Sequence, residues 1–132
     1  MSNRSGQHDL GKLVLRLALG MLILLHGIAK LKHGVGPIQG MLQAQGWPAF
    51  LAYGAYVGEV LAPLLVIAGF HARLGAAVIA INMVFAVALA HLGQLQQLND
   101  TGGWAIELQA MFLAGAITVA LIGPGRFSVN QR

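Results

Sequence analysis

Four long apolar blocks constrain the fold of this chain more than any other feature. They cover approximately residues 11–31, 50–70, 74–92 and 104–123 of the 132. Each block is about 20 residues long, enough for a helix to cross the roughly 30 Å hydrocarbon core of a bilayer. Four spans are too few for a transmembrane barrel, and the blocks lack the alternating pattern of barrel strands. The sequence therefore predicts an all-α membrane protein, an antiparallel bundle of four transmembrane helices.

Composition indicates one membrane domain over residues 1–132. Hydrophobic residues make up 57% of the chain and charged residues 9%, whereas an ordinary soluble domain has roughly 25% charged residues. The chain contains no cysteine, which excludes a thiolate nucleophile, a dithiol relay or a cysteine-ligated metal site on this chain alone. Its basic residues are scattered near the ends of the blocks instead of forming a patch, so we expect no nucleic-acid partner.

The connections between the blocks predict the topology. Residues 71–73 are a very short link, so the second and third spans should form an antiparallel hairpin. Residues 32–48 have room for a short interfacial helix or a partial lid. The basic residues divide six to two between the sides of the membrane: Arg4, Lys12, Arg16, Arg73, Arg126 and Arg132 against Lys30 and Lys32. The positive-inside rule then places both termini in the cytoplasm of a bacterium, with the protein in its inner membrane and the first span retained.

Most ionisable side chains of the spans gather in the outer, periplasmic half. Depth estimated from the helical rise brings five of them together: His26, Lys30, Glu59, His91 and Glu107. The last three each share a helical stripe with small residues, which typically face neighbouring helices. Pro63 has no N–H for the carbonyl of Glu59, so a backbone acceptor is freed beside this acid. We therefore predict a polar pocket built from these five side chains.

Asn82 is expected to lie outside the pocket. It precedes His91 by nine residues, which is half a turn out of phase in a regular helix. We expect it to form a helix–helix hydrogen bond instead.

The predicted pocket has more than one explanation. A buried carboxylate is costly in hydrocarbon, by about 2.5–3.5 kcal/mol for Asp, so Glu59 should be protonated, paired or bound. One explanation is an internal network in which Lys30 and a histidine neutralise the acids and set the helix register. Another is a divalent metal such as zinc, iron or copper held by His26, Glu59, His91 and Glu107, although no HxxxH or ExxH spacing supports it.

The explanation we favour is a quinone. Its oxygens accept hydrogen bonds, and its reduction requires protons. Lys30 and Glu107 would bind the quinone or another substrate, and Glu59, His26 and His91 would be the catalytic residues that move protons.

The chain resembles the DoxX family of small bacterial inner-membrane proteins along nearly its whole length. The matching pieces are Leu-Arg-Leu-Ala-Leu-Gly at residues 15–20, His26-Gly27 with Lys30, Gly58-Glu59 leading to Gly69, Asn82-Met83 with His91, Glu107, and Gly-Pro-Gly-Arg-Phe-Ser at residues 123–128. The family includes DoxD, the membrane subunit of thiosulfate:quinone oxidoreductase. The resemblance implies a four-helix protein that is often labelled an oxidoreductase, and many members look like accessory subunits.

Together, these arguments predict a quinone-linked redox component that works with a soluble or membrane redox partner subunit. Whether the chain is itself an oxidoreductase or a subunit of one is left open. The alternatives are a non-catalytic membrane anchor or assembly subunit of a redox complex and, less favoured, a small-molecule carrier. Gly20, Gly27 and Gly58 could also permit close packing in a homo-oligomer.

Overall fold

The computed structural model of the chain describes residues 3–91 and 96–130, and only the backbone of residues 3–5, 90 and 91. The described residues are helical throughout, apart from loops and one isolated bridge between Leu98 and Trp104. The elements are α1 (Asn3–His33), α2 (Gly36–Ala44), the 3-10 turn η1 (Ala49–Tyr53), α3 (Gly54–Tyr56), the π-helix η2 (Val57–Leu61), α4 (Ala62–Ala68), α5 (Ala72–Ala86), the π-helix η3 (Val87–His91) and α6 (Glu107–Ile122). The predicted all-α architecture is confirmed.

Three helical stretches are long and apolar enough to cross a membrane: Gly6–His33, Ala49–Ala68 and Ala72–Leu89. The fourth, α6, has 16 residues and is about 24 Å long, a few ångströms short of the roughly 30 Å hydrocarbon thickness. It begins three residues later than predicted. The cause is the bridge from Trp104 to Leu98, together with Asn99, whose side-chain oxygen accepts hydrogen bonds from the N–H groups of Thr101 and Gly103. These contacts hold residues 98–104 in a loop.

The second span is one continuous helical run of four segments, from η1 to α4. The π-helical turn Val57–Leu61 lies directly before Pro63, which cannot donate to the carbonyl four residues earlier. A π turn accommodates the missing bond by changing the hydrogen-bonding register. The run ends at Gly69, which has a left-handed φ of 71°, and the N–H of Phe70 bonds the carbonyl of Leu65. This stop produces the predicted tight hairpin with α5.

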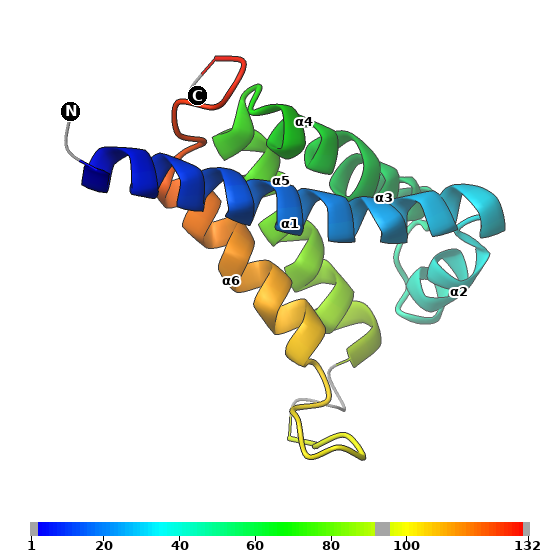
Figure 1. Cartoon of the computed structure of the whole chain (residues 1–132). Coiled ribbons are helices and arrows are strands. Elements are labelled where there is room, and N and C mark those ends of the chain that lie inside the picture. Colours follow the sequence, from blue (N-terminus) through cyan, green and yellow to red (C-terminus); the bar gives the residue numbers. More distant parts are fainter. Residues whose placement is uncertain (1–2, 92–95, 131–132) are drawn as a thin grey trace.

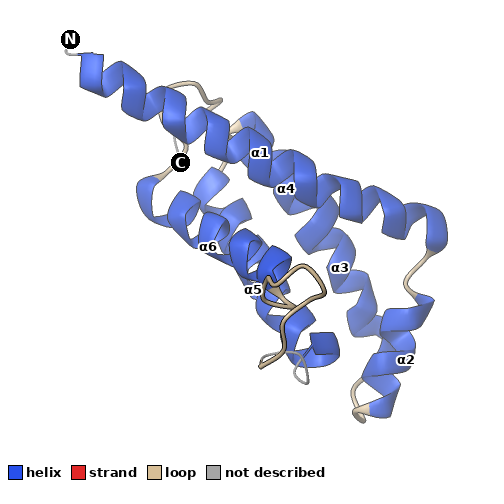
Figure 2. Ribbon diagram, turned by 60° about the horizontal axis from the view of Figure 1, so that its bottom comes forward, coloured by secondary structure: helices blue, strands red, loops and turns tan. Residues whose placement is uncertain are grey.

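The apolar core lies where α1, α4, α5 and α6 pack together. Its fully buried members include Ile23, Val66, Ile79 and Ala116. In Figure 1, α6 lies near α1 at the end that holds the chain termini, and the two axes diverge toward the opposite end. Figure 2 shows α2 at that opposite end, beside the beginning of the second span. The helices are therefore closely packed at one end and splayed at the other.

Buried Arg16 holds the terminal end together. Its guanidinium donates to the carbonyls of Val66 and Ile67 at the end of α4, and to those of Pro124 and Phe127 in the C-terminal segment, at 2.8–2.9 Å. The side chain is 1% exposed. A buried cation is tolerated here because it binds carbonyls that the end of a helix leaves without partners.

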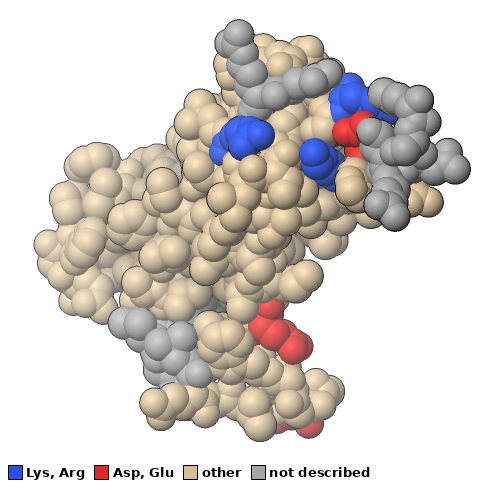
Figure 3. Space-filling model, turned by 90° about the vertical axis from the view of Figure 1, so that its left-hand side faces the viewer, with Lys and Arg blue, Asp and Glu red and all other residues tan. Residues whose placement is uncertain are grey.

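The two ends of the molecule differ in charge. On the face that Figure 3 shows, Lys and Arg side chains lie at the end of the termini, with one acidic patch beside them, and the other acidic side chains lie at the opposite end. An ion pair of 3.7 Å between Arg126 and Asp9 ties the C-terminal segment to α1. Both termini therefore lie at the same end of the bundle, as four antiparallel spans require.

Candidate functional site

An ion pair between Lys30 of α1 and Glu59 of η2 lies within the splayed half of the molecule. The ammonium nitrogen of Lys30 is 2.7 Å from Oε1 of Glu59, and the side chains are 27% and 8% exposed, respectively. Of the three states expected for Glu59, the structure has the paired one. At this burial, water screens the attraction between the two charges only weakly.

The backbone positions this pair by close helix packing. Gly27 lies one turn before Lys30, and a Cβ there would collide with the carbonyl of Glu59. Only a glycine lets α1 approach the π turn so closely. The hydroxyl of Tyr56 also donates to the carbonyl of Lys30 at 3.2 Å. Helix α1 and the second span are thus joined by three contacts around the acid.

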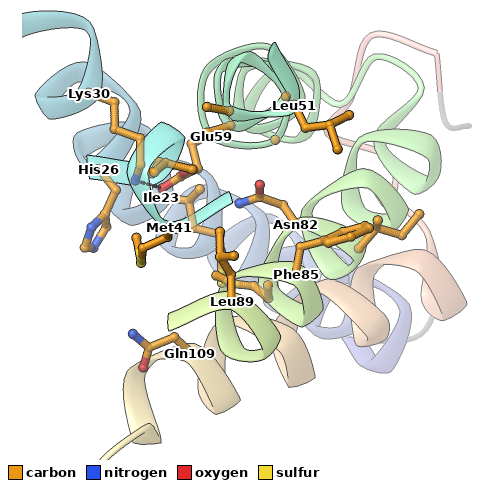
Figure 4. Close-up of a pocket in the computed structure, with 18 of the residues that line it drawn as sticks. Ile23, His26, Lys30, Met41, Leu51, Glu59, Asn82, Phe85, Leu89 and Gln109 are labelled. Carbon is orange, nitrogen blue, oxygen red and sulfur yellow. Dashed lines mark hydrogen bonds and ion pairs between the residues drawn. The ribbon is translucent and has the colours of Figure 1, made fainter. Parts of the chain in front are cut away.

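A cavity of about 480 Å³ lies beside the ion pair. Most of its wall is apolar, from α1, α2, η1, α5 and α6. The polar side chains that line it and are labelled in Figure 4 are few: His26, Lys30, Glu59, Asn82 and Gln109. The indole of Trp47, with its N–H donor, also lines it. Met41 and Leu42 of α2 line it as well, so the short helix expected in residues 32–48 covers part of the site. A mostly apolar cavity with a few polar groups is the usual form of a small-molecule site.

His26 lies at the edge of the cavity. Its side chain is exposed but lines the cavity, and its ring meets the Phe112 ring edge-on with centroids 5.8 Å apart. Among the described residues it makes no hydrogen bond, so both ring nitrogens are available to a ligand at this edge.

The prediction that Asn82 lies outside the pocket and forms a helix–helix hydrogen bond is wrong. Figure 4 shows its amide between Glu59 and Phe85, inside the cavity, and it makes no hydrogen bond with any described residue. The error has a physical cause. The count of nine residues back from His91 crosses the π-helical turn η3, which takes an additional residue and shifts the helical phase by about 100°. A Cβ at Gly58 would lie 2.6 Å from the Asn82 side chain, so this glycine makes room for the amide.

Glu107 does not share the cavity. It is exposed at the first position of α6, and its Oε1 accepts a 3.3 Å hydrogen bond from the amide of Asn99 in the preceding loop. Gln109 lines the cavity instead. Two residues turn a helix by about 200°, so Glu107 and Gln109 point to opposite sides. No sequence signal distinguished them, because the stripe of small residues fits either face.

His91 is the last residue of η3, and its side chain lies outside the described residues. Among the side chains that the structure does describe, no three from His, Cys, Asp and Glu lie together as a metal site would require. His26 and Glu59 line the cavity, but Glu107 is turned away from it.

The fold and the site define a class: a small multi-pass helical membrane protein with an ion pair beside an apolar cavity. The chain belongs to the DoxX family, whose model matches residues 11–92. It is 33% identical over 129 residues to "Uncharacterized membrane protein Rv3486" of Mycobacterium tuberculosis (strain ATCC 25618 / H37Rv), covering 89% of this chain and 78% of that relative. No solved structure matches the chain. It is therefore a multi-pass bacterial membrane protein of that family.

Proposed function

We propose that this chain binds a quinone headgroup in the cavity and acts as the quinone-linked component of a membrane redox system. One observation carries the proposal. The apolar cavity contains a buried ion pair together with an amide, Asn82, and an imidazole, His26, that make no hydrogen bond within the described part of the chain. Because these two side chains face the cavity and have no partner within the described residues, they can hydrogen-bond a ligand there.

The polar groups suit the oxygens of a quinone. Of the three ammonium hydrogens of Lys30, the bond to Glu59 uses one. The Lys30 ammonium and the Asn82 amide can both donate to a carbonyl oxygen. The volume of about 480 Å³ falls within the roughly 300–1,000 Å³ typical of small-molecule sites. A lipid-soluble molecule also reaches this depth without leaving the bilayer.

Reduction of a quinone takes up a pair of electrons and a pair of protons. His26 suits proton transfer because an imidazole can both donate and accept a proton at its ring nitrogens. The Lys30–Glu59 pair offers a second proton path, with Lys30 as the donor and Glu59 as the relay. The electrons come from a redox partner subunit, because a chain without cysteine has no thiol to supply them. On this proposal His26 and Glu59 are the catalytic residues and Lys30 and Asn82 bind the substrate.

A second function, a non-catalytic anchor or assembly subunit, is favoured by the ion pair itself. The Lys30–Glu59 bond joins α1 to the second span, and such a bond can serve only to hold the helices in register. A carrier is less well supported, because Arg16, the buried cation in the half of the molecule that holds the termini, is occupied by four carbonyls.

The double variant Lys30→Met/Glu59→Leu separates these functions. Replacing a buried ion pair by apolar residues of similar size is typically neutral or stabilising, so the bundle should remain folded. We expect the dissociation constant for decylubiquinone to rise by roughly tenfold or more. The measurement is quinone retained by captured nanodiscs, after subtraction of empty nanodiscs, and the unfolding midpoint is recorded in parallel.

Lys32→Met is the matched control, because Lys32 is exposed on the same helix outside the cavity. It should leave quinone binding within about twofold of wild type. If the folded double variant binds decylubiquinone as tightly as wild type does, the proposed site is wrong and the anchor function stands.

A further inference from the structure

The charged groups of the cavity wall and its exposed apolar side chains lie on opposite sides. Figure 4 shows Lys30 and His26 on one side, Leu51 and Phe85 on the other, and Asn82 between them. The charged groups come from α1 and η2, whereas the far side is formed by η1 and α5. A ligand that satisfies the polar groups therefore has its remaining atoms directed toward an apolar wall.

This apolar wall reaches the surface of the bundle. On this side of the cavity, four large apolar or aromatic side chains both line it and are exposed: Trp47 (49%), Leu51 (41%), Ile81 (58%) and Phe85 (55%). The rings of Trp47 and Phe85 meet edge-on, with centroids 6.3 Å apart. Three of the four lie within the apolar stretches Ala49–Ala68 and Ala72–Leu89, so their exposed surfaces face lipid. We call these four residues the apolar rim.

From this geometry we infer that the ligand carries a hydrocarbon chain, which leaves the cavity through the apolar rim and lies in the bilayer. This inference rests on the proposed function and adds the substrate class: a chain-bearing quinone, not a small water-soluble one. The side chains of the rim are apolar or aromatic and offer one hydrogen-bonding group, the indole N–H of Trp47, so the rim suits a hydrocarbon chain better than a polar one. The polar headgroup binds Lys30 and Asn82, so the headgroup enters the cavity and the hydrocarbon chain trails behind it.

The role of the rim is steric. A hydrocarbon chain that moves from lipid to the rim gains little free energy, because lipid tails are as apolar as the side chains that it meets. The rim instead gives the chain an exit, without which the attached headgroup could not reach Lys30. Narrowing the exit should therefore weaken the binding of chain-bearing quinones and leave a bare headgroup unaffected.

Ile81→Trp narrows the rim, and Ile117→Trp is its matched control. Both isoleucines are exposed on apolar helices, at 58% and 45%, but Ile117 of α6 does not line the cavity. The probes are decylubiquinone and the same dimethoxy-methyl-benzoquinone ring without its decyl chain. Binding is measured by retention on captured nanodiscs, and unfolding midpoints show that both variants fold.

For Ile81→Trp we expect a dissociation constant raised by roughly tenfold for decylubiquinone and changed by less than about twofold for the bare ring. Ile117→Trp should change neither. Equal weakening of both probes by Ile81→Trp, or no weakening of decylubiquinone, would overturn the chain exit while leaving the headgroup site intact. If the wild-type protein retains neither probe, the proposed function fails along with it.

Discussion

Two cations of α1, Arg16 and Lys30, are both withdrawn from solvent, but they have different roles. Arg16 bonds four carbonyls from two segments and has no access to the cavity. Lys30 bonds one carboxylate oxygen and lines the cavity. The planar guanidinium can reach several acceptors in fixed directions, whereas the ammonium is a compact charge on a flexible stem. Arg16 therefore suits a structural position and Lys30 suits a ligand.

This difference predicts that Arg16→Lys destabilises the fold. One ammonium cannot reach carbonyls in both α4 and residues 124–127, and each lost hydrogen bond to a charged group costs about 1.5–3 kcal/mol. We expect a loss of about 3 kcal/mol or more in unfolding free energy, measured by SDS titration of the purified protein.

Arg73→Lys is the control for this variant. Arg73 is exposed and donates to the carbonyls of Ala120 and Leu121 at the end of α6, where a cation contributes about 0.3–1 kcal/mol. A small loss for Arg73→Lys is expected. Equal losses for the two variants would mean that burial and the four contacts of Arg16 are not what stabilises the terminal end.

At the scale of elements, the two π-helical turns lie beside the polar groups. The turn η2 on the second span contains Glu59, and the turn η3 on the third span follows Asn82. Each changes the phase of its helix, so residues on its two sides face in other relative directions than a regular helix would give. Such turns are frequent at functional sites, and here an acid within one turn and an amide shortly before the other line the same cavity.

Close packing of α1 on the first π turn predicts the effect of Gly27→Ala. The added methyl group would collide with the carbonyl of Glu59 and push the two helices apart. Overpacking of this kind typically costs 1–3 kcal/mol, and we expect quinone retention to fall as the Lys30–Glu59 pair separates. SDS titration and nanodisc retention check the two effects.

The same substitution at Gly11 is the control, because nothing lies within 4 Å of a Cβ there. Gly11→Ala should be neutral or stabilising by up to about 1 kcal/mol, given the helix propensity of alanine. A similar loss for both substitutions would show that the contact with Glu59 does not matter.

At the scale of the whole molecule, we propose that the cavity lies in the periplasmic half and that both termini are cytoplasmic. The structure supplies the relative arrangement: the termini share one end, and the ion pair and cavity lie toward the other. The division of basic residues supplies the orientation. The absence of native cysteine makes this proposal directly testable with single-cysteine variants.

Thr101→Cys lies in the exposed loop before α6, and His8→Cys is exposed near the start of α1. In intact cells, a membrane-impermeant maleimide should label Thr101→Cys and not His8→Cys, and both should react once the membrane is permeabilised. The reverse pattern in intact cells would place the cavity in the cytoplasmic half.

The sequence by itself determined the helices, the tight hairpin after Gly69 and the meeting of Lys30 with Glu59. These features are local or depend on depth alone. Lipid requires every backbone group to be bonded within its segment, and the rise per residue sets how far along each span a charge lies.

Only the tertiary structure decided which way the side chains point and how the buried cations are used. Asn82 faces the cavity, which a count across the π turn η3 did not predict; Glu107 bonds Asn99 in the loop before α6; and Arg16 bonds two segments that are distant in sequence. Direction around a helix depends on where the helix begins and on every irregular turn within it. Those depend on packing against other spans, which no single stretch of sequence contains.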